Sequence, residues 1–168
     1  MTELVSPSAE SANQSAPRGL LALYVNPYRL AAYALALYAL GHTIGAVVQT
    51  PQFGPQSDAV VAQMKSVHLE AGTDTTWYGL FRGLGSTVSV FLAFSMVVCW
   101  YAGGRSHRDR LMLAPILWAL LLSQAVGAVI AFVYLFSTPM FFSILVAALL
   151  GIGCFRDLLT GRRLASLN

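Results

Sequence analysis

Four long runs of apolar residues dominate the pattern of polar and apolar positions. They cover Tyr28–Gln49, Trp77–Gly103, Leu111–Phe136 and Met140–Phe155. Each run is close to the roughly 20 residues that a helix needs to cross a bilayer. Strands of a membrane barrel would instead alternate apolar and polar residues over about ten positions. The pattern therefore predicts an all-α fold, a four-helix transmembrane bundle over residues 26–157.

The segments outside the runs complete the predicted organisation. Residues 1–25 are rich in Ser, Ala and Glu and are expected to be disordered or interfacial, before Asn26 and Pro27 open the first helix. In the long loop 50–76, the spacing of Val60, Val61, Met64 and Val67 predicts a short amphipathic helix. Residues 158–168 are expected to form a short basic tail.

Composition and charge place these helices in a membrane with a defined orientation. The chain is 57% hydrophobic and 10% charged, against about 25% charged residues in soluble domains. With four crossings, eight arginines fall on one side: Arg18, Arg29, Arg105, Arg108, Arg110, Arg156, Arg162 and Arg163. The positive-inside rule makes that side cytoplasmic. We expect a multi-pass protein of the cell inner membrane with both termini in the cytoplasm.

The net charge of +3 does not indicate a nucleic-acid partner, because the basic residues follow the loops between apolar runs. Membrane lipids are the expected partners. Cys99 and Cys154 lie toward the cytoplasmic ends of their runs, where the compartment is reducing, so we expect two small core residues rather than a disulfide.

Two titratable residues inside the apolar runs are the first candidates for a functional site. Counting residues from the helix ends places His42 and Arg82 within about one turn of each other in depth, in the outer third of the membrane. An arginine inside a membrane is costly. Arg82 could reach the outer head groups, pair with Glu70 or Asp74, or bind an anionic ligand.

His42 also has alternative interpretations. It could make a hydrogen bond between helices, or it could take part in proton exchange, metal binding or ligand contact. A pocket around His42 and Arg82 would have aromatic walls and further polar lining. Its candidate residues are Trp77, Tyr78, Phe81, Ser86, Gln124 and Tyr134.

Specific chemistries find little support. Only His42 of the three histidines lies inside a predicted helix, whereas bis-histidine haem needs two imidazoles at one depth. A zinc site from His42, His68 and Glu70 would have no characteristic spacing. All carboxylates, Asp157 included, fall in tails, loops or helix ends, which argues against a proton-coupled transporter. We predict no metal and no cofactor.

Small residues recur at four-residue spacing in every predicted helix. Such rows let helix backbones approach closely within a membrane. The glycines expected to pack against other helices are Gly41, Gly45, Gly79, Gly83, Gly127 and Gly151.

Two segments resemble a group of small bacterial membrane proteins. They are Gly41-His42-Thr43-Ile44-Gly45-Ala46 and the aromatic, glycine-rich stretch from Trp77 to Ser86. In that group a Gly-His-Thr segment ends the first helix and a Gly-x-Gly stretch opens the second. The resemblance covers about Tyr33 to Ser89. It implies a four-helix bacterial inner-membrane protein and assigns no activity or functional residue.

Three functions remain in competition. The first is a non-enzymatic protein that binds a small lipid-like or amphipathic ligand in its outer half, with His42 and Arg82 as anchors. The second is a membrane-embedded enzyme acting on a lipid or isoprenoid, with His42 as general base and Arg82 as the partner of an oxyanion or phosphate. The third is a structural or accessory subunit that docks a second copy or another membrane subunit.

Overall fold

The computed structural model describes residues 26–48, 54–70, 72, 74–135 and 137–166. Their architecture is all-α, as the sequence predicts. The elements in order are α2 (Pro27–His42), the π-helix η2 (Thr43–Val48), α3 (Pro55–Ser66), α4 (Trp77–Gly103), α5 (His107–Met112), α6 (Ala114–Tyr134) and α7 (Ser137–Ala165). The predicted N-terminal segment 1–25 lies outside the described residues.

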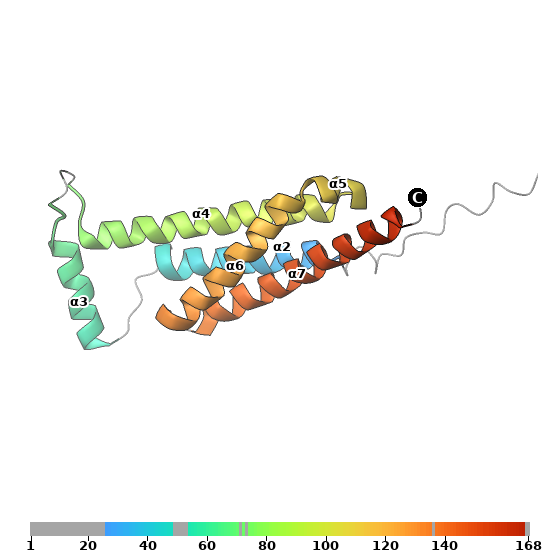
Figure 1. Ribbon diagram of the computed structural model, residues 1–168. Helices are drawn as coiled ribbons and strands as arrows, with labels where there is room; N and C mark the ends of the chain where they lie inside the picture. The colour runs from blue at the N-terminus through green and yellow to red at the C-terminus, as the bar shows by residue number, and fades with distance from the viewer. Residues whose placement is uncertain (1–25, 49–53, 71, 73, 136, 167–168) are drawn as a thin grey trace, which may run out of the picture.

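Among the described residues, three helices are long and apolar enough to cross a membrane: α4, α6 and α7. Figure 1 shows that α2 lies along α4 and α7, while the end of α6 and the start of α7 lie side by side and the two helices diverge toward the arginine-rich residues of α5 and α7. The start of α2, helix α5 and the end of α7 lie together at one end of the molecule, which we call the arginine-rich end. Helix α3 lies at the opposite end, which we call the α3 end.

The start of α2 agrees with the sequence prediction. Asn26 is the N-cap, and its side-chain oxygen accepts a hydrogen bond of 3.0 Å from the backbone N–H of Tyr28. Pro27 occupies the first turn, where no helical hydrogen bond requires its missing N–H. The Asn26 amide also donates to the carbonyl of Gly103 at 3.0 Å, so the same residue ties α2 to the end of α4.

The last helix is longer than the apolar pattern indicates. The fourth run was expected at Met140–Phe155, but α7 comprises 29 residues. Pro139 lies in its first turn, where the missing N–H breaks no helical hydrogen bond. The charged residues after Phe155 continue the helix. Arg162 and Arg163 lie in the last turn, where positive charge interacts favourably with the helix dipole. Most of the predicted basic tail is therefore helical.

Two shorter helices occupy the links. Helix α5 lies in the basic link, where Ser106 caps it by accepting a hydrogen bond of 3.3 Å from the N–H of Asp109. Helix α3 lies in the long loop and follows Gly54, whose φ of 103° is a conformation that favours glycine. No residue of α3 is buried.

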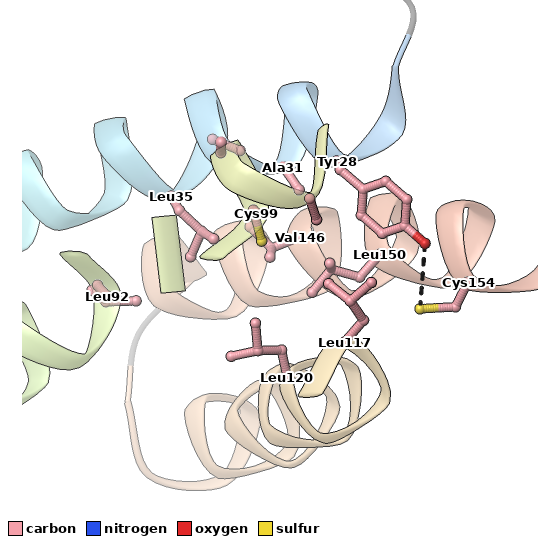
Figure 2. Close-up of a cluster of buried hydrophobic side chains, with 13 residues drawn as sticks. Tyr28, Ala31, Leu35, Leu92, Cys99, Leu117, Leu120, Val146, Leu150 and Cys154 are labelled. Carbon is pink, nitrogen blue, oxygen red and sulfur yellow. Dashed lines mark hydrogen bonds between the residues drawn. The ribbon is translucent and has the colours of Figure 1, made fainter. Parts of the chain in front are cut away.

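The core is concentrated toward the arginine-rich end. Figure 2 shows side chains of four helices converging there, and those labelled are Tyr28, Ala31, Leu35, Leu92, Cys99, Leu117, Leu120, Val146, Leu150 and Cys154. Every buried residue of α4 lies in its second half, between Leu92 and Ala102. Both cysteines are buried and free. The first half of α4 therefore contributes no buried residue.

Candidate functional site

His42, the last residue of α2, makes a hydrogen bond between helices. Its Nδ1 lies 3.0 Å from the hydroxyl oxygen of Ser89 on α4. The hydroxyl of Thr43 lies 3.0 Å from the same oxygen and 2.7 Å from the carbonyl oxygen of Ala39. The Gly-His-Thr segment is thus joined to α4 at the point where α2 changes into the π-helix η2.

Arg82 does not lie at the level of His42. It precedes Ser89 by seven residues on α4, which corresponds to about 10 Å along the axis, or two turns. Counting from helix ends predicted a separation of about one turn, on the assumption that the two helices end at the same depth. Figure 1 shows instead that α4 extends well past the end of η2. Arg82 therefore lies nearer the α3 end than His42 does.

The ring of Tyr78 lies close to two cationic side chains at the α3 end. The guanidinium carbon of Arg82 is 5.9 Å from the centre of its ring, and Nζ of Lys65 is 4.8 Å from it. Cations within about 6 Å of an aromatic ring are attracted by its quadrupole. The sequence prediction did not include Lys65, because nothing local indicates that α3 returns to the start of α4.

Backbone hydrogen bonds hold α3 against α4. The N–H of Leu69 donates to the carbonyl of Thr75 at 2.8 Å, and that of Trp77 donates to the carbonyl of Val67 at 3.1 Å. The two helices form the walls of an open cavity of about 220 Å³. Its lining is largely apolar and consists of Val60, Gln63, Met64, Val67 and Trp77. An apolar cavity and two cations thus lie side by side at this end.

The remaining site candidates are spread over the molecule. Trp77 and Phe81 on α4 are 49% and 57% exposed, and the Ser86 hydroxyl donates to the carbonyl of Arg82 at 2.9 Å. Gln124 and Tyr134 lie on α6, which packs mainly on α7. Gln124 is buried, whereas Tyr134 is 79% exposed. The structure groups Trp77, Tyr78 and Arg82 near Lys65 and leaves the two α6 residues on a different helix pair.

The predicted packing glycines fall into two sets. A Cβ added at Gly127 would lie 3.7 Å from the Ser143 hydroxyl oxygen, and one at Gly151 would lie 3.9 Å from Leu121. A Cβ at Gly79 would touch Thr75 of its own helix start. The second set consists of Gly41, Gly45 and Gly83. A Cβ added at any of these glycines would have no neighbouring atom of the described residues within 4 Å.

A second polar site lies at the arginine-rich end and was missed by the sequence prediction. Asp157 on α7 is only 8% exposed and accepts four hydrogen bonds. Arg110 of α5 donates two of them, from Nε at 2.8 Å and from Nη2 at 2.9 Å. The Tyr28 hydroxyl donates at 2.9 Å, and Nδ1 of His107 lies 3.1 Å from the carboxylate. Asp157 thereby joins α2, α5 and α7.

The strongest interaction in this cluster is the pairing of the Arg110 guanidinium with the Asp157 carboxylate. A bidentate arginine–carboxylate pair is among the stronger polar interactions in proteins. The Asp157 carboxylate, by accepting hydrogen bonds from the guanidinium, raises the pKa of Arg110 above its ordinary value. Since a carboxylate can only accept, the hydrogen of His107 resides on Nδ1. Its other nitrogen, Nε2, is buried and has no hydrogen-bond partner among the described residues.

A signal for Asp157 was present in the sequence. Ser143, Val146, Leu150, Cys154 and Asp157 are buried and follow each other at intervals of three or four residues. Asp157 therefore continues the core-facing stripe of α7. The sequence prediction did not identify Asp157 as a core-facing residue because the fourth apolar run was expected to end at Phe155.

Within the described residues, one group of charged side chains thus lies at each end of the molecule. In comparisons with known proteins, no protein-family model, no curated protein and no solved structure matches the chain.

Proposed function

We propose that the chain is an integral inner-membrane protein of a bacterium that crosses the membrane four times as a bundle. Three crossings are α4, α6 and α7. The fourth is α2 with η2, whose 16 and six residues form one stretch of roughly 30 Å, the thickness of the hydrocarbon core. The arginine-rich end faces the cytoplasm, as the positive-inside rule requires, so both termini do too.

We further propose that the protein binds a small lipid-like or amphipathic ligand with an anionic head group at the α3 end. The observation that carries this proposal is that the cationic groups of Lys65 and Arg82 both lie within 6 Å of the centre of the Tyr78 ring. An anionic head group placed there meets two cations that two different helices supply. The adjoining apolar cavity beside Trp77 and the exposed ring of Phe81 accept the apolar part of the ligand.

His42 has a supporting position in this proposal. It lies about two turns from Arg82 and is hydrogen-bonded to Ser89, so it holds α2 against α4 rather than contacting the head group. The ligand reaches the site from the outer leaflet, because α3 and the start of α4 lie at the non-cytoplasmic end in this orientation.

The test compares anionic and zwitterionic lipids. The full chain in neutral detergent is titrated with spin-labelled phosphatidylglycerol and phosphatidylcholine, and native mass spectrometry identifies co-purified lipid. We expect Arg82→Gln and Lys65→Gln each to weaken phosphatidylglycerol binding about tenfold, the loss of one charge-assisted contact. The matched control is Arg105→Gln, since Arg105 lies 4.0 Å over Tyr101 at the opposite end. Equal losses in all three variants would show general charge attraction and refute the site.

A second candidate, an accessory subunit, is favoured by one observation. Gly41 and Gly83 are exposed, and added Cβ atoms there would meet nothing within 4 Å, so these small residues serve no contact within the described chain. Gly41→Leu would then abolish the pull-down of a partner subunit or a second copy without lowering stability. Gly127→Leu is the internal comparison, because its side chain would collide with α7 near Ser143. Retention of every complex by Gly41→Leu would exclude this surface.

A further inference from the structure

The last part of α7 extends beyond the level at which α2 begins and α4 ends. The ring of Tyr28 contacts α7 at Gly153, where an added Cβ would be 2.6 Å from Cζ. Asn26 donates to the carbonyl of Gly103 at the end of α4. Past Gly153, α7 continues for about 12 residues to Ala165, which is roughly 18 Å along its axis. If α2 and α4 span the membrane as we propose, about three turns of α7 lie outside the hydrocarbon core.

This terminal segment of α7 has two different faces. On one face, Asp157 is paired with a side chain of α5, and a Cβ added at Gly161 would meet another at 3.8 Å. On the opposite face, Phe155 and Leu159 are 55% and 56% exposed, and Arg162 follows them one turn later. Residues separated by three, four or seven positions share one face of a helix. The contacts with α5 therefore fix which face of the segment points away from the protein.

The exposed face continues an apolar row that begins near the start of α7. The row is exposed throughout and consists of Phe141, Ile144, Ala148, Ile152, Phe155 and Leu159. The next residue of the row is Arg162. The ring of Trp118 on α6 meets Phe155 edge-on at 5.3 Å, and tryptophan is enriched at membrane–water interfaces. The row therefore leads from the lipid-facing surface of the bundle into the interface.

The free charges around the end of this row are positive. The guanidinium groups of four arginines form no hydrogen bond or ion pair with any described residue: Arg108, Arg156, Arg162 and Arg163. The two carboxylates described at this end are already engaged. Asp157 is paired with Arg110, and Asp109 accepts a hydrogen bond of 2.9 Å from the hydroxyl of Ser106. The exposed face thus lies among positive charges that the described chain does not compensate.

An apolar face bordered by arginines fits anionic phospholipid best. A second copy of the chain would bring its own arginines to the same surface, and like charges in contact oppose association. Phospholipid supplies acyl chains that cover apolar side chains and phosphates that pair with guanidinium groups. Arginine clusters next to a membrane-spanning helix attract anionic lipid for this reason. Lipid that covers the apolar row already lies beside the arginines.

We propose that the terminal face of α7, formed by Phe155, Leu159, Arg162 and Arg163, is a docking surface for anionic phospholipid of the cytoplasmic leaflet. Phe155 and Leu159 contact the acyl chains near the head group, and the two arginines bind the phosphates. The contacts of the opposite face with α5 position the surface. The proposal rests on the membrane crossing proposed above, but it shares no residue with the ligand site at the α3 end.

The test places a reporter on the terminal face itself. A fluorophore is attached to Leu159→Cys in the full chain, which is reconstituted in phosphatidylcholine vesicles. The chain without this substitution is the blank, since Cys99 and Cys154 are buried. Phosphatidylglycerol and phosphatidylcholine with a nitroxide near the head-group end of one acyl chain are added separately, and each quenches the fluorophore on contact. The ratio of the two quenching constants measures the local preference for anionic lipid.

Two double variants of the labelled chain remove the same charge from the same end. Arg162→Gln with Arg163→Gln removes the proposed phosphate ligands, and Arg105→Gln with Arg108→Gln is the matched control outside α7. All four side chains are exposed, and circular dichroism verifies that both variants fold. An arginine near an anionic surface contributes about fivefold to binding. We therefore expect a preference for phosphatidylglycerol of at least about fivefold in the labelled chain, below about twofold in the α7 variant and above about threefold in the control.

Three results would overturn the proposal. Quenching by neither lipid would place the terminal face in water, where it could serve only a protein partner. Equal quenching by both lipids would show apolar contact without preference for negative charge. Equal losses in the two double variants would show general attraction to the arginine-rich end. Failure of the ligand site at the α3 end would leave these readings unchanged, because the reporter lies at the opposite end, so the two proposals fail separately.

Discussion

Gly153→Ala tests a close contact between α2 and α7. The ring of Tyr28 lies so near the α7 backbone that a Cβ added at Gly153 would be 2.6 Å from Cζ and 2.8 Å from Cε1. The ring cannot turn aside easily, because Tyr28 is 2% exposed and its hydroxyl donates to Asp157. The two helices would have to separate by about 1 Å to restore an ordinary carbon–carbon distance.

The magnitude follows from two opposing effects. Overpacking of this kind costs about 1–3 kcal/mol. Alanine gains about 0.8–1.0 kcal/mol over glycine in a helix interior. Gly151→Ala, two residues away, receives the same gain, but its Cβ would meet only Leu121 at 3.9 Å. The difference in unfolding free energy between the two variants is therefore the overpacking cost, about 1–3 kcal/mol.

The assay is unfolding in mixed micelles with an increasing fraction of sodium dodecyl sulfate, followed by circular dichroism and tryptophan fluorescence. We expect Gly153→Ala to be less stable than Gly151→Ala, and Gly151→Ala to be at least as stable as the unmodified chain. If the two variants differ by less than about 0.5 kcal/mol, the proposed close contact of Tyr28 with α7 is refuted.

Further predictions concern the hydrogen-bonded clusters. Asp157→Ala and Arg110→Ala should each lower the unfolding free energy by about 3–5 kcal/mol, because each leaves the other charge unpaired. The double variant should lose less than the sum, and a double-mutant cycle measures the difference. Tyr28→Phe should cost about 1.5–3 kcal/mol in the same unfolding assay, since it removes one hydrogen bond to a charged group; no loss would show that the Tyr28 hydroxyl is dispensable. His42→Ala should cost about 1 kcal/mol and should be non-additive with Ser89→Ala in a cycle; strict additivity would refute the hydrogen bond between α2 and α4.

Much of the fold was predictable because it depends on local pattern. The second apolar run coincides with α4, and the N-cap and first-turn proline of α2 are where the sequence places them. The C-terminal extension of α7 was not predicted, because hydropathy marks the part of a helix that suits a membrane rather than the end of its hydrogen bonding. Helix α5 has a capping serine in its sequence, but its six residues, four polar ones followed by Leu111 and Met112, are too few to show an apolar period.

The candidate sites were predictable only in part, because they depend on register between distant segments. Arg82 and Tyr78 were named from their positions on one helix. Lys65 joins them through backbone pairing between Val67 and Trp77, which no local pattern encodes. The Tyr28 hydroxyl and the Asp157 carboxylate are 129 residues apart in sequence. One sequence without a fold gives no means to place them together.

The uneven core has a mechanical consequence for α4. Its second half is fixed by buried side chains from Leu92 to Ala102, while its first half has none. Resistance to opening within a protein follows the local density of buried contacts. The part of α4 before Ser89, the residue that is hydrogen-bonded to His42, can therefore bend away from the neighbouring helices and leave the charged cluster at the other end intact. In the membrane orientation and at the ligand site that we propose, such bending would open a sideways path from the bilayer to Tyr78, so the ligand would reach that ring without crossing the aqueous face of the protein.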